Sequence, residues 1–340
     1  MKVCIVGAGA VGGLIGTRIA ASSGAEVSAL ARGETAQALR KNGWQLKQGG
    51  KLISAPAAAV SDDPRALGLQ DLVVVAVKAT AMTSVAESVS ALLGPDTIVL
   101  PAMNGVPWWF THGISAAGAA PLDSVDPGGA IAKAIPQTQV IGCVVHLAAS
   151  TEAPGVVQHR NGMGLIVGEP DGSLSPRLKT VHDLLSKAGF DVTSTPKIRH
   201  EVWYKLWGNM TMNPVSAITG ATGDRMLDDR QVRDFCSAAM LEAAAIGARL
   251  GCAIDQTPEE RHAVTRELGA FKTSMLQDAE RGRPIELDAL VTAVCELGRR
   301  TGVATPYIDA LLGLTRLFAQ SRGLYPATTG SSLLAPRTGP

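Results

Sequence analysis

The sequence predicts an α/β domain at the N-terminus followed by an all-α domain. Three observations lead to this prediction. A glycine-rich turn joins a short apolar run to a helical stretch at the start of the chain, β-branched runs recur up to about residue 195, and beyond residue 197 only helix-like periodicity is left. We therefore expect an α/β domain over residues 1–196, a helical domain over residues 197–325, and a mobile tail over residues 326–340, which is rich in Thr, Gly, Ser and Pro.

The composition is typical of a compact protein and argues against several classes of partner. With 340 residues, 46% of them hydrophobic, the chain has enough apolar material for two domains with a large core. Its 31 basic and 30 acidic residues nearly cancel, so nucleic acids and anionic membranes are poor candidate partners. Five scattered cysteines without a CxxC pair favour reduced thiols over a disulfide frame or a zinc site. We expect no signal peptide and no membrane span, and hence a cytoplasmic protein.

The start of the chain has the pattern of a dinucleotide site. Lys2–Val6 (KVCIV) is typical of a strand buried on both faces, and the helix expected over residues 14–21 would point its first amides at phosphates. Between them, a first glycine would permit the tight turn, a second would let the backbone approach a pyrophosphate, and a third would let helix pack on strand. The spacing therefore predicts a Rossmann-like site made of Gly7, Ala8, Gly9, Ala10, Val11 and Gly12.

The end of the second expected strand, Glu26–Ala31, indicates which dinucleotide binds. Sites for NAD place an acidic residue there to hold the ribose 2′-hydroxyl, whereas this chain has Arg32. A guanidinium suits a 2′-phosphate, and Arg40 could assist from the next helix. The alternative is a solvated loop arginine. We favour NADPH/NADP⁺ as the cofactor.

Two polar residues follow the next expected strands. Lys78 comes after Asp71–Val77, where it could meet a cofactor phosphate, the nicotinamide region or the substrate. Asn104 comes after Thr97–Leu100 and precedes a glycine, so it could bind a substrate carboxylate or merely shape a turn. The residues alone do not separate these two interpretations of Asn104.

The stretch from residue 106 to residue 138 predicts no definite element, and its Trp108, Trp109 and Phe110 could cover a cleft or pack in the core. Strands are expected next, at residues 139–149, 155–159 and 164–168, then a helix at 174–188 and a strand at 190–195. His146 and His159 lack the spacing of metal ligands, so we expect structural histidines and no metal.

The second domain is expected to contain helices at residues 233–250, 258–281, 285–301 and 305–320. Before them, the apolar stretch Trp203–Pro214 carries Lys205, Asn209 and Asn213 at intervals of four, which places them along one helix face. A lysine among large apolar residues either reaches water with its head group or is kept for chemistry. Ser274 at a helix end and Glu286 after a turn form a second polar group, which by itself is typical of an exposed helix-turn-helix.

Taken together, five motifs in this order resemble those of the ketopantoate reductase (2-dehydropantoate 2-reductase) family. They are GAGAVG, VKAT at residues 77–80, Asn104-Gly105, KLWGNMTMNPVSAITG at residues 205–220, and SMLQDAERGRPIELDAL at residues 274–290. The last two are much more specific than the glycine motif. The resemblance implies a Rossmann-like domain, an all-helical domain of the 6-phosphogluconate-dehydrogenase-like kind, and a cleft between them. In that family NADPH reduces ketopantoate to (R)-pantoate for pantothenate and coenzyme A synthesis.

The resemblance also implies roles for individual residues. Lys205 matches the catalytic lysine and Glu286 its acidic partner. Lys78 matches a lysine beside the cofactor, where Asn104 is also expected. The residues that match the lining of the substrate pocket are Asn104, Asn209, Asn213 and Ser274. A protonated lysine would stabilise the negative charge on the keto oxygen and donate the proton, with the carboxylate orienting the lysine or the substrate.

Two departures from the family pattern leave other functions open. An Asn-Gly pair common after the KLWGN motif is replaced here by Gly223-Asp224, and the stretch at residues 108–139 is longer than usual. The chain could therefore reduce another small 2-keto acid. A β-hydroxyacid dehydrogenase is a rival enzyme, although its glycine motif usually reads GxxGxG, and an NADP-binding sensor without turnover is a rival of another class. Long helices in the second domain could supply a homodimer interface.

Overall fold

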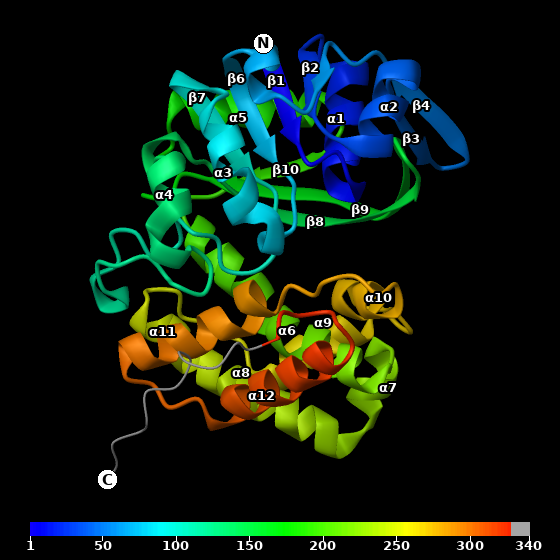
Figure 1. Ribbon diagram of the computed structural model, residues 1–340. Coiled ribbons are helices and arrows are strands. Elements are labelled where there is room, and N and C mark those ends of the chain that lie inside the picture. The colour runs from blue at the N-terminus through cyan, green and yellow to red at the C-terminus, as the bar shows by residue number, and fades with distance from the viewer. Residues whose placement is uncertain (328–340) are drawn as a thin grey trace.

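The computed structural model describes residues 1–327, and it has the fold class that the sequence predicts (Figure 1). All strands of the described residues lie between Lys2 and Ser194, and the chain beyond Ile198 is helical. Most of the tail predicted to be mobile, residues 328–340, lies outside the described residues. The division predicted between residues 196 and 197 stays a prediction.

The first sheet is parallel, and its strand order places a binding edge at the end of its central strand. Because β1 lies between β2 and β6, the chain leaves β1 towards one side and returns on the other. Ligands bind at such a switch point, outside the carboxyl ends of the strands. In spatial order the strands are β5 (Val60–Ser61), β2 (Glu26–Leu30), β1 (Lys2–Val6), β6 (Gln70–Val75) and β7 (Leu93–Pro101).

A second sheet was only partly predicted. Its hairpin of β3 and β4 was missed, and the strands expected at residues 155–159 and 164–168 are one continuous strand, β9. The polar stretch between the two expected strands lies inside β9, where the pairing with β8 shifts its register and Gly162 has φ +69°. The turn residues therefore do not end the strand. The strands are β3 (Trp44–Gln48), β4 (Lys51–Ala55), β8 (Gly142–Ala153), β9 (Val156–Gly168) and β10 (Asp191–Ser194).

Helix α1 (Ala10–Ser22) packs between the two sheets, and its small residues make this possible. A Cβ on Gly13 would press on Val157 of β9, and a Cβ on Gly16 would press on the ring of Trp44 in β3. Glycine at these positions lets backbone and side chains approach closely. The remaining α-helices of this domain are α2 (Gly33–Asn42), α3 (Met82–Ser90), α4 (Ala130–Ala134) and α5 (Pro176–Lys187).

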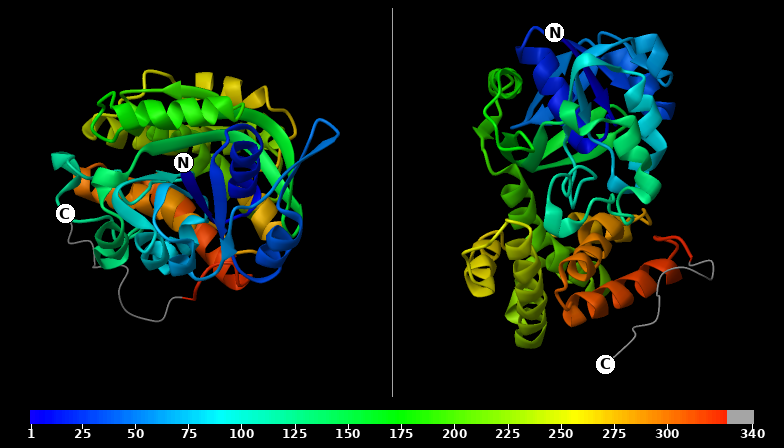
Figure 2. Two further views of the ribbon diagram at one scale, coloured as in Figure 1. Left: turned by 90° about the horizontal axis from the view of Figure 1, so that it is seen from above. Right: turned by 90° about the vertical axis from the view of Figure 1, so that its left-hand side faces the viewer.

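The helical domain is built around α6 (Ile198–Thr219), which runs down from the α/β domain (Figures 1 and 2). Its buried indoles fix its position, because Trp203 donates to the Ala243 carbonyl at 3.2 Å and Trp207 to the Met240 carbonyl at 2.7 Å, both on α8. The other helices are α7 (Gly223–Asp228), α8 (Arg230–Arg249), α9 (Pro258–Arg266), α10 (Ser274–Glu280), α11 (Ala293–Thr301) and α12 (Pro306–Ser321).

Two helix predictions in this domain were wrong in extent. The helix predicted over residues 258–281 is two helices, because Gly269 has φ +65° and Thr273 caps α10 by accepting the Leu276 N–H. The helix predicted over residues 285–301 starts later and opens with a π-helical turn, Asp288–Thr292. Glu286 therefore lies in the loop before that turn.

The stretch at residues 106–138 is fastened to the helical domain. Arg199 on α6 donates to the Phe110 and His112 carbonyls, and Glu296 on α11 accepts the N–H groups of Asp123 and Ser124. The sequence left open whether Trp108, Trp109 and Phe110 cover a cleft or pack in the core. All three rings are buried in the core.

Two further findings bear on the expected class of protein. In the part of the chain that the structure describes, no helix is both long and apolar enough to cross a membrane. All five cysteines are free and buried.

Candidate active site

The glycine turn after β1 has the geometry of a dinucleotide site. Gly7 has φ +91°, and a Cβ on Gly12 would overlap the Gly7 carbonyl oxygen and press on Ile5. A Cβ on Gly9, in contrast, would meet no atom within 4 Å. The turn is thus closed at Gly12 and open at Gly9, the residue directly before α1, and such an opening at a helix N-terminus suits a pyrophosphate.

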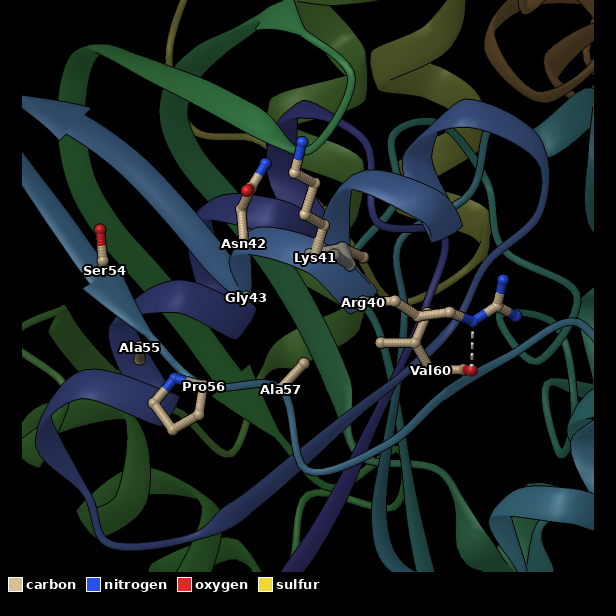
Figure 3. Close-up of a pocket in the computed structure, with 10 residues that line it drawn as sticks. Arg40, Lys41, Asn42, Gly43, Ser54, Ala55, Pro56, Ala57 and Val60 are labelled. Atoms are coloured by element: carbon tan, nitrogen blue, oxygen red, sulfur yellow. Dashed lines mark hydrogen bonds between the residues drawn. The ribbon is translucent and has the colours of Figure 1, made fainter.

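Arg32, predicted to select NADP, stands exposed at the N-terminal end of α2, directly after β2. No hydrogen bond or ion pair to another described residue occupies its guanidinium, which leaves it available for a phosphate. Arg40 lies in the last turn of α2 and donates Nε–H to the Val60 carbonyl at 3.1 Å (Figure 3). The hollow drawn in that figure, between the end of α2, β4 and β5, contains none of the predicted catalytic or substrate residues.

Lys205 reaches from α6 to the carboxyl edge of the first sheet. Its Nζ donates to Asn104 Oδ1 at 2.8 Å and to the Val145 carbonyl of β8 at 2.5 Å. Burial lowers the pKa of Lys205 to about 8, while attraction to Cys143 and Glu286 opposes the fall. The ammonium is thus poised to exchange a proton near neutral pH.

Glu286 lines a second hollow, together with Ala79 and Asp288. Its Oε1 accepts the Ala79 N–H at 2.9 Å, which ties the loop after β6 to the helical domain. Burial raises the pKa of Glu286, and the positive charges of Lys78 and Lys205 counteract that rise. The charges of Glu286 and the candidate catalytic lysine therefore each shift the pKa of the other group.

Lys78 forms an ion pair with Asp278 on α10, a residue that the sequence analysis missed. Asp278 follows Ser274 by four residues, so both lie on one face of α10, and its place in the SMLQD motif was the available signal. In this structure Lys78 thus bridges the two domains, and its predicted contact with the cofactor stays a prediction.

Asn104 and Gly105 lie in a turn, which is one of the two roles that the sequence left open, and binding of a substrate carboxylate by Asn104 stays a prediction. The Asn104 side chain binds Lys205, whereas Gly105 has φ +82° and forms the turn. A Cβ on Gly105 would press on the backbone of Ala289, whose carbonyl accepts the Val106 N–H at 2.8 Å. The turn therefore fixes Asn104 against the helical domain.

The other predicted substrate residues are placed differently from one another. Asn209 lines a small recess together with Asn104 and Lys205. Asn213 is buried one turn further along α6, and Ser274 is exposed at the first position of α10. The structure therefore joins Asn104, Lys205 and Asn209 in one recess, while the roles of Asn213 and Ser274 stay predictions.

Gly223, the departure from the family pattern, is explained by packing. It begins α7, its N–H donates to the Phe271 carbonyl at 2.9 Å, and a Cβ would overlap the Phe271 ring. The altered sequence at Gly223 thus packs against Phe271, which lies three residues before Ser274 in the chain.

His146 lies on β8 near the candidate lysine. Burial together with the charges of Lys205 and Arg261 lowers the pKa of His146 to about 4, so it is neutral at physiological pH.

Among the described residues, no group of three or more His, Cys, Asp or Glu side chains could hold a metal ion.

Comparisons with known proteins point to one family. Residues 3–172 match the family model described as ketopantoate reductase PanE/ApbA, and residues 197–319 match the one described as its C-terminal part. A 2-dehydropantoate 2-reductase of Mesorhizobium japonicum is 42% identical over 96% of this chain and 100% of the relative.

Solved structures show the same fold. A Ralstonia solanacearum protein assigned to the ketopantoate reductases is 54% identical, with a TM-score of 0.91 over 95% of this chain and 99% of that one. A ternary structure of D-mandelate dehydrogenase with NADH and anilino(oxo)acetate is 23% identical, with a TM-score of 0.81 over 95% of this chain and 100% of that one. This second likeness concerns the fold alone.

Proposed function

The chain belongs to the ketopantoate reductase family, and on this basis we propose that it reduces 2-dehydropantoate (ketopantoate) to (R)-pantoate with NADPH. The product would feed pantothenate and coenzyme A synthesis. One observation carries the proposal: a lysine with a lowered pKa, Lys205, meets Asn104 at the carboxyl edge of a dinucleotide-binding sheet.

The proposed reaction assigns distinct tasks to the chain's own residues. The residues that would hold the cofactor are the turn of Gly7 to Gly12, Arg32, Lys78 and Asn104, and the open space at Gly9 fits such a group. When bound, NADPH supplies the hydride that adds to the keto carbon. The ammonium of Lys205 stabilises the charge that develops on the keto oxygen and then donates a proton to it. Glu286 favours the protonated lysine through its charge.

Substrate binding is assigned to the side of the cleft that α6 and α10 form. Asn104 and Asn209 line the recess beside Lys205, and amide groups there can hydrogen-bond the keto acid without adding charge. Asn213 and Ser274 are proposed as further contacts, on the family resemblance. No metal is part of the proposed mechanism.

The pH profile of the reaction should report the pKa of Lys205. Because the folded-state pKa of about 8 lies below the usual 10.5, the proton donor is present below pH 8 and lost as the pH rises through 8. We expect kcat/KM for reduction to fall about tenfold per pH unit above pH 8. The kcat/KM for the reverse oxidation, which needs the unprotonated lysine, should rise with pH up to about 8. Initial rates across this range measure the profile, and an apparent pKa close to 10.5 would contradict the assignment.

Arg32 is expected to select the phosphorylated cofactor. Removing its guanidinium with Arg32→Ala should raise KM for NADPH by about 10- to 100-fold, since charge-assisted hydrogen bonds to a phosphate are lost. KM for NADH, which lacks the 2′-phosphate, should stay the same. Arg40→Ala, in the last turn of α2, should raise KM for NADPH less, because Arg40 already donates to the Val60 carbonyl. Equal losses for both cofactors in Arg32→Ala would mean that the variant acts on the fold.

The proposal is tested by following NADPH oxidation at the nicotinamide absorbance with a panel of 2-keto acids. Ketopantoate should be turned over fastest. The panel includes phenylglyoxylate, the keto acid of mandelate, because D-mandelate dehydrogenase shares the fold. Preference for another keto acid would keep the reaction type and change the substrate. Binding of NADPH without reduction of any panel member would favour the NADP-binding sensor. The cytoplasmic location stays a prediction.

A further inference from the structure

The chain turns back after α12 and forms a short strap, residues 323–325, against the helical domain. Gly323 has φ +67°, which permits the reversal, and the Leu324 N–H donates to the Ala319 carbonyl at 2.8 Å. The Leu324 side chain is only 2% exposed. Figure 1 shows the strap in the red loop after α12, on the side of the helical domain that faces the α/β domain. The strap is thus a fixed part of the fold.

The strap holds the segment that carries Glu286 on both sides of this residue. The Leu324 carbonyl accepts the N–H of Ile285, directly before Glu286, at 3.1 Å. The Tyr325 hydroxyl donates to Oδ1 of Asp288, two residues after Glu286, at 2.6 Å. Two hydrogen bonds, one on each side, therefore fix the loop from which the Glu286 side chain projects.

The segment held by the strap contacts two loops at the carboxyl edge of the first sheet. Glu286 accepts the Ala79 N–H at 2.9 Å, in the loop after β6. The Ala289 carbonyl accepts the Val106 N–H at 2.8 Å, in the loop after β7. That second loop also carries Asn104, which binds the candidate catalytic lysine. The position of this segment therefore determines how groups on both loops meet the helical domain.

We propose that Tyr325 is a positioning residue of the candidate active site, which holds residues 285–288 in the place where the Glu286 charge acts on Lys205. The inference rests on the proposed function, in which Glu286 favours the protonated lysine. Tyr325 acts through Asp288 and the backbone between Asp288 and Glu286, and it has no assigned contact with the substrate or the cofactor.

The chemistry of Tyr325 suits a permanent contact of this kind. Burial and the hydrogen bond to Asp288 raise the pKa of the Tyr325 phenol above its usual value. The phenol therefore stays protonated, and remains a donor, through the pH range in which Lys205 loses its proton. A hydrogen bond to a carboxylate is stronger than one between neutral groups. Phenylalanine at this position would keep the ring and remove only the donor.

The charges around Lys205 make the role of Tyr325 measurable. Burial lowers the pKa of Lys205 to about 8, and the charges of Cys143 and Glu286 oppose this fall. Lys78 and Asp278 act in turn on Glu286. Tyr325→Phe changes none of these charges and only frees the segment that carries Glu286. If that segment shifts away from the lysine, the pKa of Lys205 falls further, because burial then meets less opposition.

The test is the pKa of Lys205 in the full-length protein, measured by an NMR titration of isotope-labelled lysine side chains and assigned with Lys205→Ala. We expect a lower pKa in Tyr325→Phe than in the wild type, and a still lower one in Glu286→Gln. Adding Tyr325→Phe to Glu286→Gln should change the pKa no further, since no carboxylate is left to position. This measurement needs no substrate, so it separates failure of this inference from failure of the proposed function.

Turnover supplies a second readout. Tyr325→Phe should lower kcat/KM for keto acid reduction about tenfold, the effect of losing one hydrogen bond to a charged group, while NADPH affinity and circular dichroism stay as in the wild type. Tyr307→Phe is the matched control, because Tyr307 is 47% exposed and its hydroxyl bonds no other described residue. Both the pKa of Lys205 and kcat/KM should stay unchanged in this control.

Two results would overturn the proposal. One is a wild-type pKa of Lys205 in Tyr325→Phe, which would mean that the strap does not position Glu286. The other is a fall of the pKa that Tyr325→Phe causes equally with and without the Glu286 carboxylate, since the variant would then act on the fold in general.

Discussion

Lys205→Ala is expected to lower kcat/KM for keto acid reduction by about 2 to 4 decades, the usual cost of removing a general acid. The variant loses the ammonium that donates to Asn104 at 2.8 Å and, in the proposed reaction, to the keto oxygen. NADPH should still bind, because the glycine turn and Arg32 are unchanged. The measurement is steady-state NADPH oxidation together with NADPH affinity from fluorescence.

Lys197→Ala is the matched control for this variant. Lys197 is an exposed lysine that immediately precedes α6, so its removal deletes the same charge next to the same helix and away from Lys205. Its kcat/KM should stay within about twofold of the wild type, as expected for a surface substitution that costs at most ~0.5 kcal/mol. If Lys205→Ala kept more than a tenth of the wild-type rate, Lys205 would not be the proton donor.

Gly12→Ala is expected to destabilise the α/β domain, because its Cβ would overlap the Gly7 carbonyl oxygen, a backbone atom that cannot turn aside. Overpacking of this kind costs about 1–3 kcal/mol, and shifting the turn should also abolish NADPH binding. Urea unfolding measures the free energy, and NADPH titration measures the binding.

Gly9→Ala separates the two effects. Gly9 has φ −80°, which alanine tolerates, and its Cβ would point into open space. The free energy of unfolding should therefore change by less than about 0.5 kcal/mol. KM for NADPH should still rise about tenfold or more, since the methyl group would stand where the pyrophosphate approaches. Equal stability losses in the two variants would contradict the assignment of the glycine turn.

The parts of the site that sequence could predict are those fixed by short-range geometry. Gly7, Gly9 and Gly12 follow from the strand-turn-helix pattern, and the intervals of four that join Lys205 to Asn209 follow from the helical period. The fold class followed in the same way, because the runs of β-branched residues end before Ser194 and only helices come after.

What the sequence could not predict depends on how distant segments dock. The Lys78 ion pair with Asp278 spans 200 positions, and the Glu286 contact with the Ala79 N–H spans 207. No local pattern encodes such a contact. Strand β9 was divided in two for a similar reason, since its polar middle is held by pairing with β8 and not by its own propensity.

The most direct test of the proposed function is to follow the hydride itself. The enzyme would be incubated with ketopantoate and NADPH that carries deuterium at C4 of the nicotinamide, on the transferred face, and the product would be analysed by mass spectrometry. We expect pantoate with one deuterium bound at C2, formed by the wild type and about 2 to 4 decades more slowly by Lys205→Ala. Unlabelled product, or no pantoate while NADPH is bound, would contradict the proposed function.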